Sequence, residues 1–363
     1  MRLLLIVASA CAIGKRTQIK RARRSEAETK ALPHCNATDL ALGLPGGVWR
    51  AAPGRRASGF GADAAPGAAP DQYARPVHDF APATCRLRRF DARDFAGRCA
   101  AGRRVAFLGD SLGEQVWKAL LGLLAHGGAR AERAACGPGC AADRFSVAGA
   151  RLDVLERFKV SRFDGAALDA VDAAARFRAG DVVLLSFGAH YRNASHLAAD
   201  VSAIVGWIAA GPSRRRATWV WRETSPSHFP VPSGAYEDMV ACPACLRWPL
   251  RCRRARDLGA QRWRVAAAAP ALDAAAFDLR TLPLWELLKA AWRAHPGAGA
   301  PLRLEEDCGG DAGRLRVRAT ASKGTCALDC LHLAPRYNHL AARLLYHGRR
   351  SAARSPSPSA TAR

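Results

Sequence analysis

The stretch Val105-Ala-Phe-Leu-Gly-Asp-Ser-Leu112 predicts a buried strand that runs directly into a tight turn and then into a helix. Its first four residues are apolar, as expected for a strand that is covered on both faces. Gly109 permits a sharp turn, so Ser111 falls at the start of the helix, where backbone N–H groups can stabilise a negative charge. Ser111 is therefore a candidate nucleophile. The alternative is that its hydroxyl only caps the helix.

Apolar runs of strand length and of helical spacing continue along the chain. The expected strands are residues 104–108, 181–187 and 218–222, and the expected helices are residues 112–124, 195–209, 284–293 and 338–346. Strands that alternate with helices predict an α/β fold with a mostly parallel sheet covered by helices on both faces. Ligands of such sheets bind at the carboxyl ends of the strands, so the residues that follow each strand are candidates for the site.

The composition divides the chain into four parts. We expect a short secretory signal in residues 1–13, a loop-rich basic lead segment in 14–100, the α/β domain in 101–348 and a disordered tail in 349–363. The apolar run of the first part is well below the roughly 20 residues that span a membrane. A cleaved signal is therefore preferred over the alternative, a type II Golgi anchor.

The chain is strongly basic, with 55 Lys and Arg against 31 Asp and Glu and a formal charge of +24. Such a surface attracts polyanions: nucleic acid, acidic polysaccharide or anionic lipid head groups. The sequence has no zinc-finger, helix-turn-helix or aromatic RNA-binding motif, so we do not expect a nucleic-acid partner. The remaining alternatives are an acidic glycan and no specific partner, since the many arginines can also reflect biased codon usage.

Cysteine usage indicates an oxidising compartment. The 12 cysteines are spread along the chain, which favours disulfides of a secretory-pathway protein in the Golgi lumen or outside the cell. The alternative is a zinc site built from four of them, Cys136, Cys140, Cys242 and Cys245. No His lies at zinc-finger spacing from these cysteines, so we expect no metal. Two N-glycosylation acceptors agree with a glycoprotein of this compartment, Asn36 and Asn193.

A second group of reactive side chains lies just before the last expected helix. Asp329 and His332 are separated only by Cys330 and one further residue. Serine becomes a strong nucleophile when a base removes its proton, and a His oriented by a carboxylate is the usual base. We therefore expect Ser111, His332 and Asp329 to form a catalytic group. The alternative is a surface loop that a disulfide of Cys330 holds in place.

Five segments follow one another in a fixed order: residues 80–92 (FAPATCRLRRFDA), 109–111 (GDS), 181–191 (DVVLLSFGAHY), 222–229 (RETSPSHF) and 329–332 (DCLH). Together they resemble the PC-esterase family, a branch of the GDSL/SGNH hydrolase superfamily. This family includes the plant trichome-birefringence-like polysaccharide O-acetyltransferases. The likeness extends over about residues 80–347.

The resemblance implies a three-layer α/β/α sandwich and acyl transfer through an acyl-serine intermediate on Ser111, with His332 as base and Asp329 as its orienting carboxylate. It also implies an acetyl donor as co-substrate, no bound cofactor, and a polysaccharide or oligosaccharide acceptor. The expected function is O-acetylation of polysaccharide hydroxyls. The alternatives are a carbohydrate O-acetyl esterase and a glycan-binding protein without turnover.

Oxyanion and substrate-binding roles are expected for residues at or after the strand ends: Gly109, Asp110, Ser186, Gly188, His190, Arg222 and His228. For His190 and His228 the alternatives are a glycan site, a shared metal or a structural hydrogen bond. For Arg222 they are the recognition of an acidic substrate group or a buried ion pair.

The chain departs from the family pattern at three places. Ser186 stands where the family has an oxyanion Asn, and its hydroxyl can donate one hydrogen bond. In the family, a glycine supplies a second backbone N–H to the oxyanion, and the candidate for that glycine in this chain is Gly149. Leu333-Ala-Pro335 stands where the family continues with Trp and a Cys. Cys330 is therefore expected to find another disulfide partner.

Overall fold

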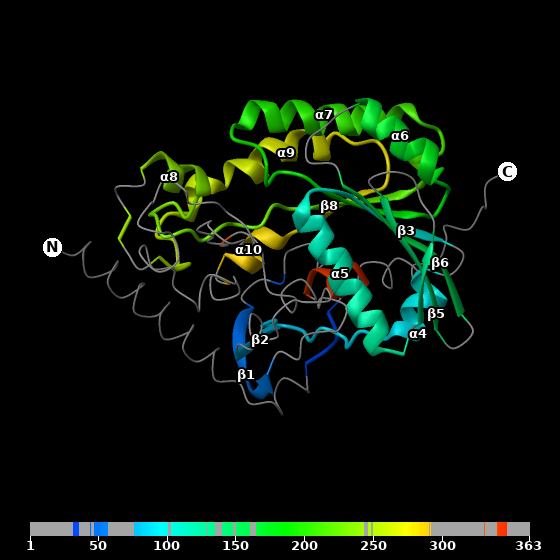
Figure 1. Ribbon diagram of the computed structural model, residues 1–363, viewed down its shortest axis with the longest axis horizontal. Coiled ribbons are helices and arrows are strands. Elements are labelled where there is room, and N and C mark those ends of the chain that lie inside the picture. Colours follow the sequence, from blue (N-terminus) through cyan, green and yellow to red (C-terminus); the bar gives the residue numbers. More distant parts are fainter. Residues whose placement is uncertain are drawn as a thin grey trace, which may run out of the picture.

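A seven-stranded sheet forms the middle layer of the computed structural model (Figure 1). Its strands are β3 (Arg104–Gly109), β4 (Arg130–Ala134), β5 (Cys140–Val147), β6 (Ala150–Lys159), β7 (Val182–Ser186), β8 (Thr218–Arg222) and β9 (Leu279–Leu282). Their order in the sheet is β4-β5-β6-β3-β7-β8-β9. Strands β6, β3, β7, β8 and β9 pair in parallel with one another, whereas β5 is antiparallel to both of its neighbours, β4 and β6. The expected mostly parallel sheet is confirmed.

The structure describes residues 32–35, 44, 47–56, 76–100, 103–128, 130–134, 140–147, 150–159, 165–242, 246–247, 250–289, 291, 330 and 340–346. The expected signal segment, residues 1–13, and the expected tail, residues 349–363, lie outside these ranges.

Helices cover both faces of the sheet, so the fold is the expected three-layer α/β/α sandwich (Figure 1). One outer layer contains α5 (Ser111–His126), α10 (Leu284–Leu288) and the helical residues 340–346, which share one hydrophobic core. The other contains α6 (Gly165–Ala175), α7 (Ala194–Ala210) and α9 (Trp263–Asp273), which share a second core.

Side chains of the central strands point alternately into these two cores. In β3, Val105 and Phe107 lie in the core shared with α5, whereas Ala106 and Leu108 lie in the core shared with α7. All four are at most 2% exposed. Because both faces are covered, residues 105–108 are all apolar, which explains the continuous hydrophobic run in the sequence.

The order of the parallel strands changes direction at β3. The chain places β6 on one side of β3 and later places β7 on the other side. In open α/β sheets, ligands bind outside the carboxyl ends of the strands at such a reversal. The segments that follow β3 and β7 therefore occupy the position that the topology favours for a site.

The described part of the lead segment contains elements that the sequence did not predict. β1 (Val48–Arg56) and β2 (Pro76–Ala81) form a two-stranded antiparallel sheet, and α4 (Ala92–Asp94) continues into the π-helical turn η2 (Phe95–Cys99). The indole N–H of Trp49 donates to the carbonyl of Leu287 at 2.7 Å. The lead segment is thus packed against the layer that contains α10.

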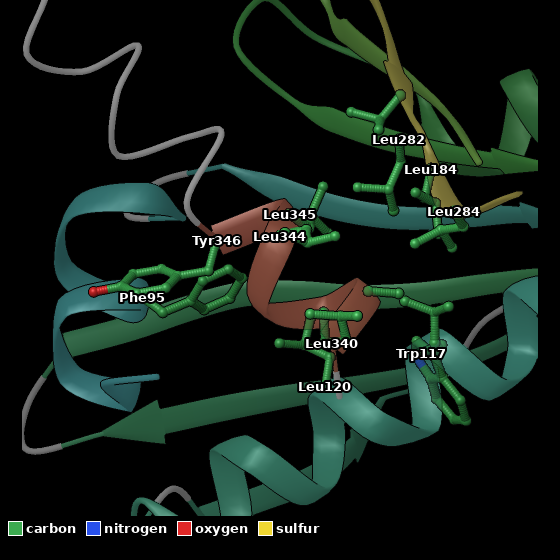
Figure 2. Packing of buried hydrophobic residues seen from close by; sticks show 14 of the residues in the cluster. Phe95, Trp117, Leu120, Leu184, Leu282, Leu284, Leu340, Leu344, Leu345 and Tyr346 are labelled. Atoms are coloured by element: carbon green, nitrogen blue, oxygen red, sulfur yellow. The ribbon is translucent and has the colours of Figure 1, made fainter. Parts of the chain in front are cut away.

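Residues 340–346 fill the core on the α5 side of the sheet (Figure 2). Leu340 lies near Leu120 of α5 in this view. Tyr346 packs edge-on against Phe90, with ring centroids 5.3 Å apart, and its hydroxyl donates to Asp94 at 2.5 Å. The C-terminal helical residues therefore connect the lead segment to the central domain.

Between pairs of described residues, two disulfides join segments that are distant in sequence, Cys35–Cys85 and Cys252–Cys330. Disulfides persist in oxidising compartments, so these bonds are compatible with a secreted or lumenal protein. Within the described ranges, none of the helices combines the length and the apolar character that crossing a membrane requires.

Candidate active site

The turn between β3 and α5 requires glycine at its first position. Gly109 has a φ of 144°, a conformation that residues with a Cβ rarely adopt. A Cβ built on Gly109 would lie 1.9 Å from the carbonyl oxygen of Ser186. The ends of β3 and β7 therefore touch through their backbones, and Ser111 follows this contact by two residues.

The Asp110 carboxylate joins the segments that meet at this turn. Asp110 is 2% exposed. Its Oδ1 accepts hydrogen bonds from the Leu112 N–H at 3.0 Å and the Ser186 hydroxyl at 3.1 Å. Its Oδ2 accepts from the Ala189 N–H at 3.2 Å. One side chain thus holds the start of α5, the end of β7 and the loop after β7.

Asp110, and not Ser111, caps α5. Its carbonyl accepts the N–H of Glu114 at 3.2 Å, which begins the helical hydrogen bonding, while its carboxylate accepts the N–H of Leu112. Ser111 is therefore the first helical residue, and it is half-buried. A helix cannot pair its own first N–H groups, and such groups can stabilise an oxyanion.

Ser186 supports the turn from β7. It is 1% exposed, and a Cβ built on Gly113 would lie 2.8 Å from the Ser186 Cβ. The single proton of the Ser186 hydroxyl is donated to Asp110. The Ser186 hydroxyl therefore holds the Asp110 carboxylate in place.

The loop after β7 packs directly on the segment after β8. Gly188 has a φ of 132°, and a Cβ there would lie 2.0 Å from Oγ1 of Thr224. The Thr224 hydroxyl donates to the Phe187 carbonyl at 3.0 Å. His190, two residues further along this loop, is exposed. The loop therefore presents His190 at the surface while its Ala189 N–H supports Asp110.

Arg264 of α9 holds the same loop, a role that the sequence did not indicate. Its buried guanidinium donates to the carbonyls of Gly188 at 3.3 Å and Tyr191 at 3.4 Å. It also pairs with Glu237 of α8 (Tyr236–Ala241) at 3.0 Å. Burial lowers the pKa of Arg264, and Glu237 opposes that shift. No pattern distinguishes this arginine from the many others in the sequence, so only the fold identifies it.

Arg222, the last residue of β8, is completely buried. It donates to the Glu223 carbonyl at 3.0 Å and to the Ser225 hydroxyl at 2.7 Å. Burial lowers its pKa to about 10, while the negative charges of Asp110 and Glu223 oppose the shift. Arg222 therefore shapes the segment after β8 and supplies positive charge to the interior near Asp110.

His228 lies where three segments meet. It is fully buried, and its Nε2–H donates to the Lys289 carbonyl at 3.1 Å, because a carbonyl can only accept. Its backbone N–H donates to the Cys330 carbonyl at 2.9 Å, and its own carbonyl accepts the Arg253 N–H at 3.0 Å. Burial lowers the pKa of His228 to about 4, so the ring is neutral at pH 7. The ring therefore makes a structural hydrogen bond, which is one of the three alternatives for His228.

The Cys252–Cys330 disulfide fixes the same junction. Cys330 is buried and is the residue after Asp329 and the second residue before His332. Asp329, His332 and Gly149 themselves lie outside the described residues. Through Cys330, the segment that carries both candidate catalytic partners of Ser111 is attached to the loop that follows β8.

The structure brings no group of three or more potential metal ligands together among the residues it describes. Cys242, part of the alternative zinc site, is disulfide-bonded. Asn193, the acceptor of the second glycosylation site, is exposed and caps α7 by accepting the His196 N–H at 2.8 Å.

No protein-family model and no curated protein matches this chain. The chemistry has to be inferred from the geometry of the chain itself. Ser111 is the first residue of a 16-residue helix at the point where the order of the parallel strands reverses. Such a position suits a nucleophile that attacks a carbonyl group, because backbone N–H groups at a helix start can stabilise the oxyanion that forms.

Proposed function

We propose that this protein is a serine-dependent O-acyltransferase that transfers acyl groups, most simply acetyl, to polysaccharide hydroxyls in the Golgi lumen or outside the cell. The observation that carries the proposal is the position of Ser111. It begins α5 at the reversal point of the sheet, and Asp110 performs the capping function that would otherwise explain a serine there.

In the proposed reaction, His332 accepts the hydroxyl proton of Ser111 as the Oγ attacks the carbonyl carbon of the acyl donor. The bond to the leaving group of the donor breaks, and that group takes the proton from His332. A sugar hydroxyl then gives its proton to His332 and attacks the acyl-serine, and the Oγ leaves and regains a proton. Asp329 orients the imidazole, and N–H groups at the start of α5 stabilise each oxyanion.

Two further observations support this assignment. The chain resembles the PC-esterase family in five ordered segments, two of which contain Ser111 and the pair Asp329 and His332. The disulfide and the backbone hydrogen bond of Cys330 attach the second of these segments to the loop after β8. Because β8 is separated from β3 by β7 alone, its loop lies at the same edge of the sheet as Ser111.

The test is acetyl transfer from para-nitrophenyl acetate to xylo-oligosaccharide or oligogalacturonide by the full chain and by Ser111→Ala. Ser213→Ala is the matched control, because Ser213 is exposed and precedes the short helix η3 (Arg214–Arg216) before β8, at the opposite edge of the sheet. We expect nitrophenol release and acetylated oligosaccharide from the wild type and Ser213→Ala, and neither above background from Ser111→Ala.

The products distinguish the alternatives. Free acetate without acetylated sugar, lost in Ser111→Ala, would assign the protein as an esterase. Nitrophenol release that is the same in the wild type and Ser111→Ala would contradict a serine mechanism. Oligosaccharide binding without any turnover would identify a glycan-binding protein instead.

A further inference from the structure

Residues 250–262, here named the arginine segment, present a row of positive charges to solvent. Leu250, Cys252 and Ala255 face the interior. The arginines that alternate with or follow these positions are all exposed: Arg251, Arg253, Arg254, Arg256 and Arg262. The segment contains one acidic residue, Asp257, so five arginines less one aspartate leave a net charge of +4.

This segment is attached to the loop that follows β8. The Arg253 N–H donates to the His228 carbonyl at 3.0 Å. The Gln261 side chain accepts the Ser227 N–H and donates to the Ser227 carbonyl, both at 2.9 Å. Cys252 adds the disulfide to Cys330. The arginine segment therefore borders the same chain segments that the proposed function assigns to the catalytic edge of the sheet.

We propose that the arginine segment binds the carboxylate groups of an acidic polysaccharide and so holds the acceptor next to Ser111. This inference deepens the proposed function and rests on it for the site of reaction. Guanidinium groups match carboxylates through paired, charge-assisted hydrogen bonds. A row of them suits a polymer that repeats the same charge along its length.

The chemistry of the exposed positions favours a polysaccharide over a single-stranded nucleic acid. Nonspecific binding of single strands combines a basic surface with aromatic rings on which bases stack. The exposed residues of the arginine segment include no aromatic side chain. An acidic polysaccharide supplies both the carboxylates that arginine recognises and the hydroxyls that the proposed acyl transfer consumes.

The opposite edge of the sheet offers a matched control for overall charge. Arg215 and Arg216 of η3 are also exposed and adjacent in sequence, but they precede β8 instead of following it. The double variants Arg253→Gln/Arg254→Gln and Arg215→Gln/Arg216→Gln each remove two positive charges. Any general effect of net charge on polyanion binding is therefore the same in both.

The experiment measures the Kd of the full chain for a labelled oligogalacturonide and for a neutral xylo-oligosaccharide. Because exposed charge pairs each contribute modestly, we expect Arg253→Gln/Arg254→Gln to weaken oligogalacturonide binding about tenfold. The Arg215→Gln/Arg216→Gln variant should change the Kd for oligogalacturonide less than about twofold, since salt screens interactions between charges over roughly 8 Å at physiological ionic strength. Xylo-oligosaccharide should bind equally to all three proteins.

Equal weakening in the two double variants would overturn the inference, because net charge alone would then explain binding. Tighter binding of duplex DNA or of anionic lipid vesicles than of oligogalacturonide, reduced by the Arg253→Gln/Arg254→Gln change, would also overturn it. Binding is measured without turnover and repeated in Ser111→Ala. Failure of the acyl-transfer proposal is therefore separable from failure of this one.

Discussion

The substitution Asp110→Asn tests whether the Ser111 turn depends on a carboxylate. The two oxygens of Asp110 accept from the N–H groups of Leu112 and Ala189 and from the Ser186 hydroxyl. An amide has only one acceptor oxygen, so in either orientation its NH2 group faces one of the two backbone N–H groups. An unpaired buried donor costs about 1–3 kcal/mol. Loss of negative charge at the start of α5 adds about 0.3–1 kcal/mol.

Asp181→Asn is the matched control. Asp181 is also 2% exposed, and its two oxygens accept the N–H groups of Arg104 at 3.0 Å and Arg178 at 2.9 Å. It lies before β7, at the edge of the sheet away from Ser111. We expect Asp110→Asn to lower the free energy of unfolding by about 1–4 kcal/mol and Asp181→Asn to lower it by about 1–3 kcal/mol. Only Asp110→Asn should also slow acylation, by about 10- to 100-fold, because a small displacement of a nucleophile has effects of this size.

Unfolding in urea, followed by circular dichroism, gives the change in stability. Nitrophenol release from para-nitrophenyl acetate gives the acylation rate, measured at a temperature where all variants are folded. Equal loss of acylation in Asp110→Asn and Asp181→Asn would refute the reasoning, because stability alone would then account for both. A wild-type acylation rate in Asp110→Asn would refute it as well.

Two further predictions concern His228 and Gly113. Because the pKa of His228 is lowered from 6.5 to about 4, its neutral ring contributes fully to stability above pH 6.5, and this contribution is lost as the pH falls toward 4. Urea unfolding should lose about 2 kcal/mol between pH 7 and pH 5 from this group, and His228→Gln should remove that difference. Gly113→Ala should lower the free energy of unfolding by about 1–3 kcal/mol, since its Cβ would lie 2.8 Å from that of Ser186. Gly206→Ala in α7, where the Cβ meets open space, should instead raise it by about 1 kcal/mol.

One result for His228 and one for the two glycines would contradict these predictions. A pH dependence that is unchanged in His228→Gln would show that other groups cause it. Equal effects of Gly113→Ala and Gly206→Ala on urea unfolding would mean that helix propensity dominates, and that the contact of Gly113 with Ser186 is not tight in solution.

Strands β3, β7 and β8 were predictable because burial on both faces leaves a continuous apolar run, whereas β4, β5 and β6 were not among the expected strands. The expected strand 218–222 has the same bounds as β8, and the expected strand 181–187 differs from β7 by one residue at each end. β9 was not predicted, because only Leu282 of its four residues is buried. An edge strand of this kind lacks the pattern that identifies a central one. The expected helix 284–293 was too long: α10 ends at Leu288, and the next carbonyl, that of Lys289, accepts from His228.

The site was predictable only where it depends on strand ends. Gly109 and Ser186 end neighbouring strands, and the expected strands end within one residue of each. The contact of Arg264 with Gly188 joins residues 76 positions apart, and no local pattern specifies it. A His after a strand looks the same in sequence whether it faces solvent or the interior. For His228, the fold buries the ring at the Cys252–Cys330 junction, and sequence alone does not specify disulfide pairing.

The central claim is that the Ser111 hydroxyl becomes acylated. Peptide mapping by mass spectrometry, after rapid acid quenching of the full chain with para-nitrophenyl acetate, tests it most directly. We expect one acetyl group on the peptide that contains Ser111 in the wild type, and none on the corresponding peptide of Ser111→Ala. An unmodified Ser111 in protein that still turns over the ester, with the acetyl group on another side chain, would contradict the claim.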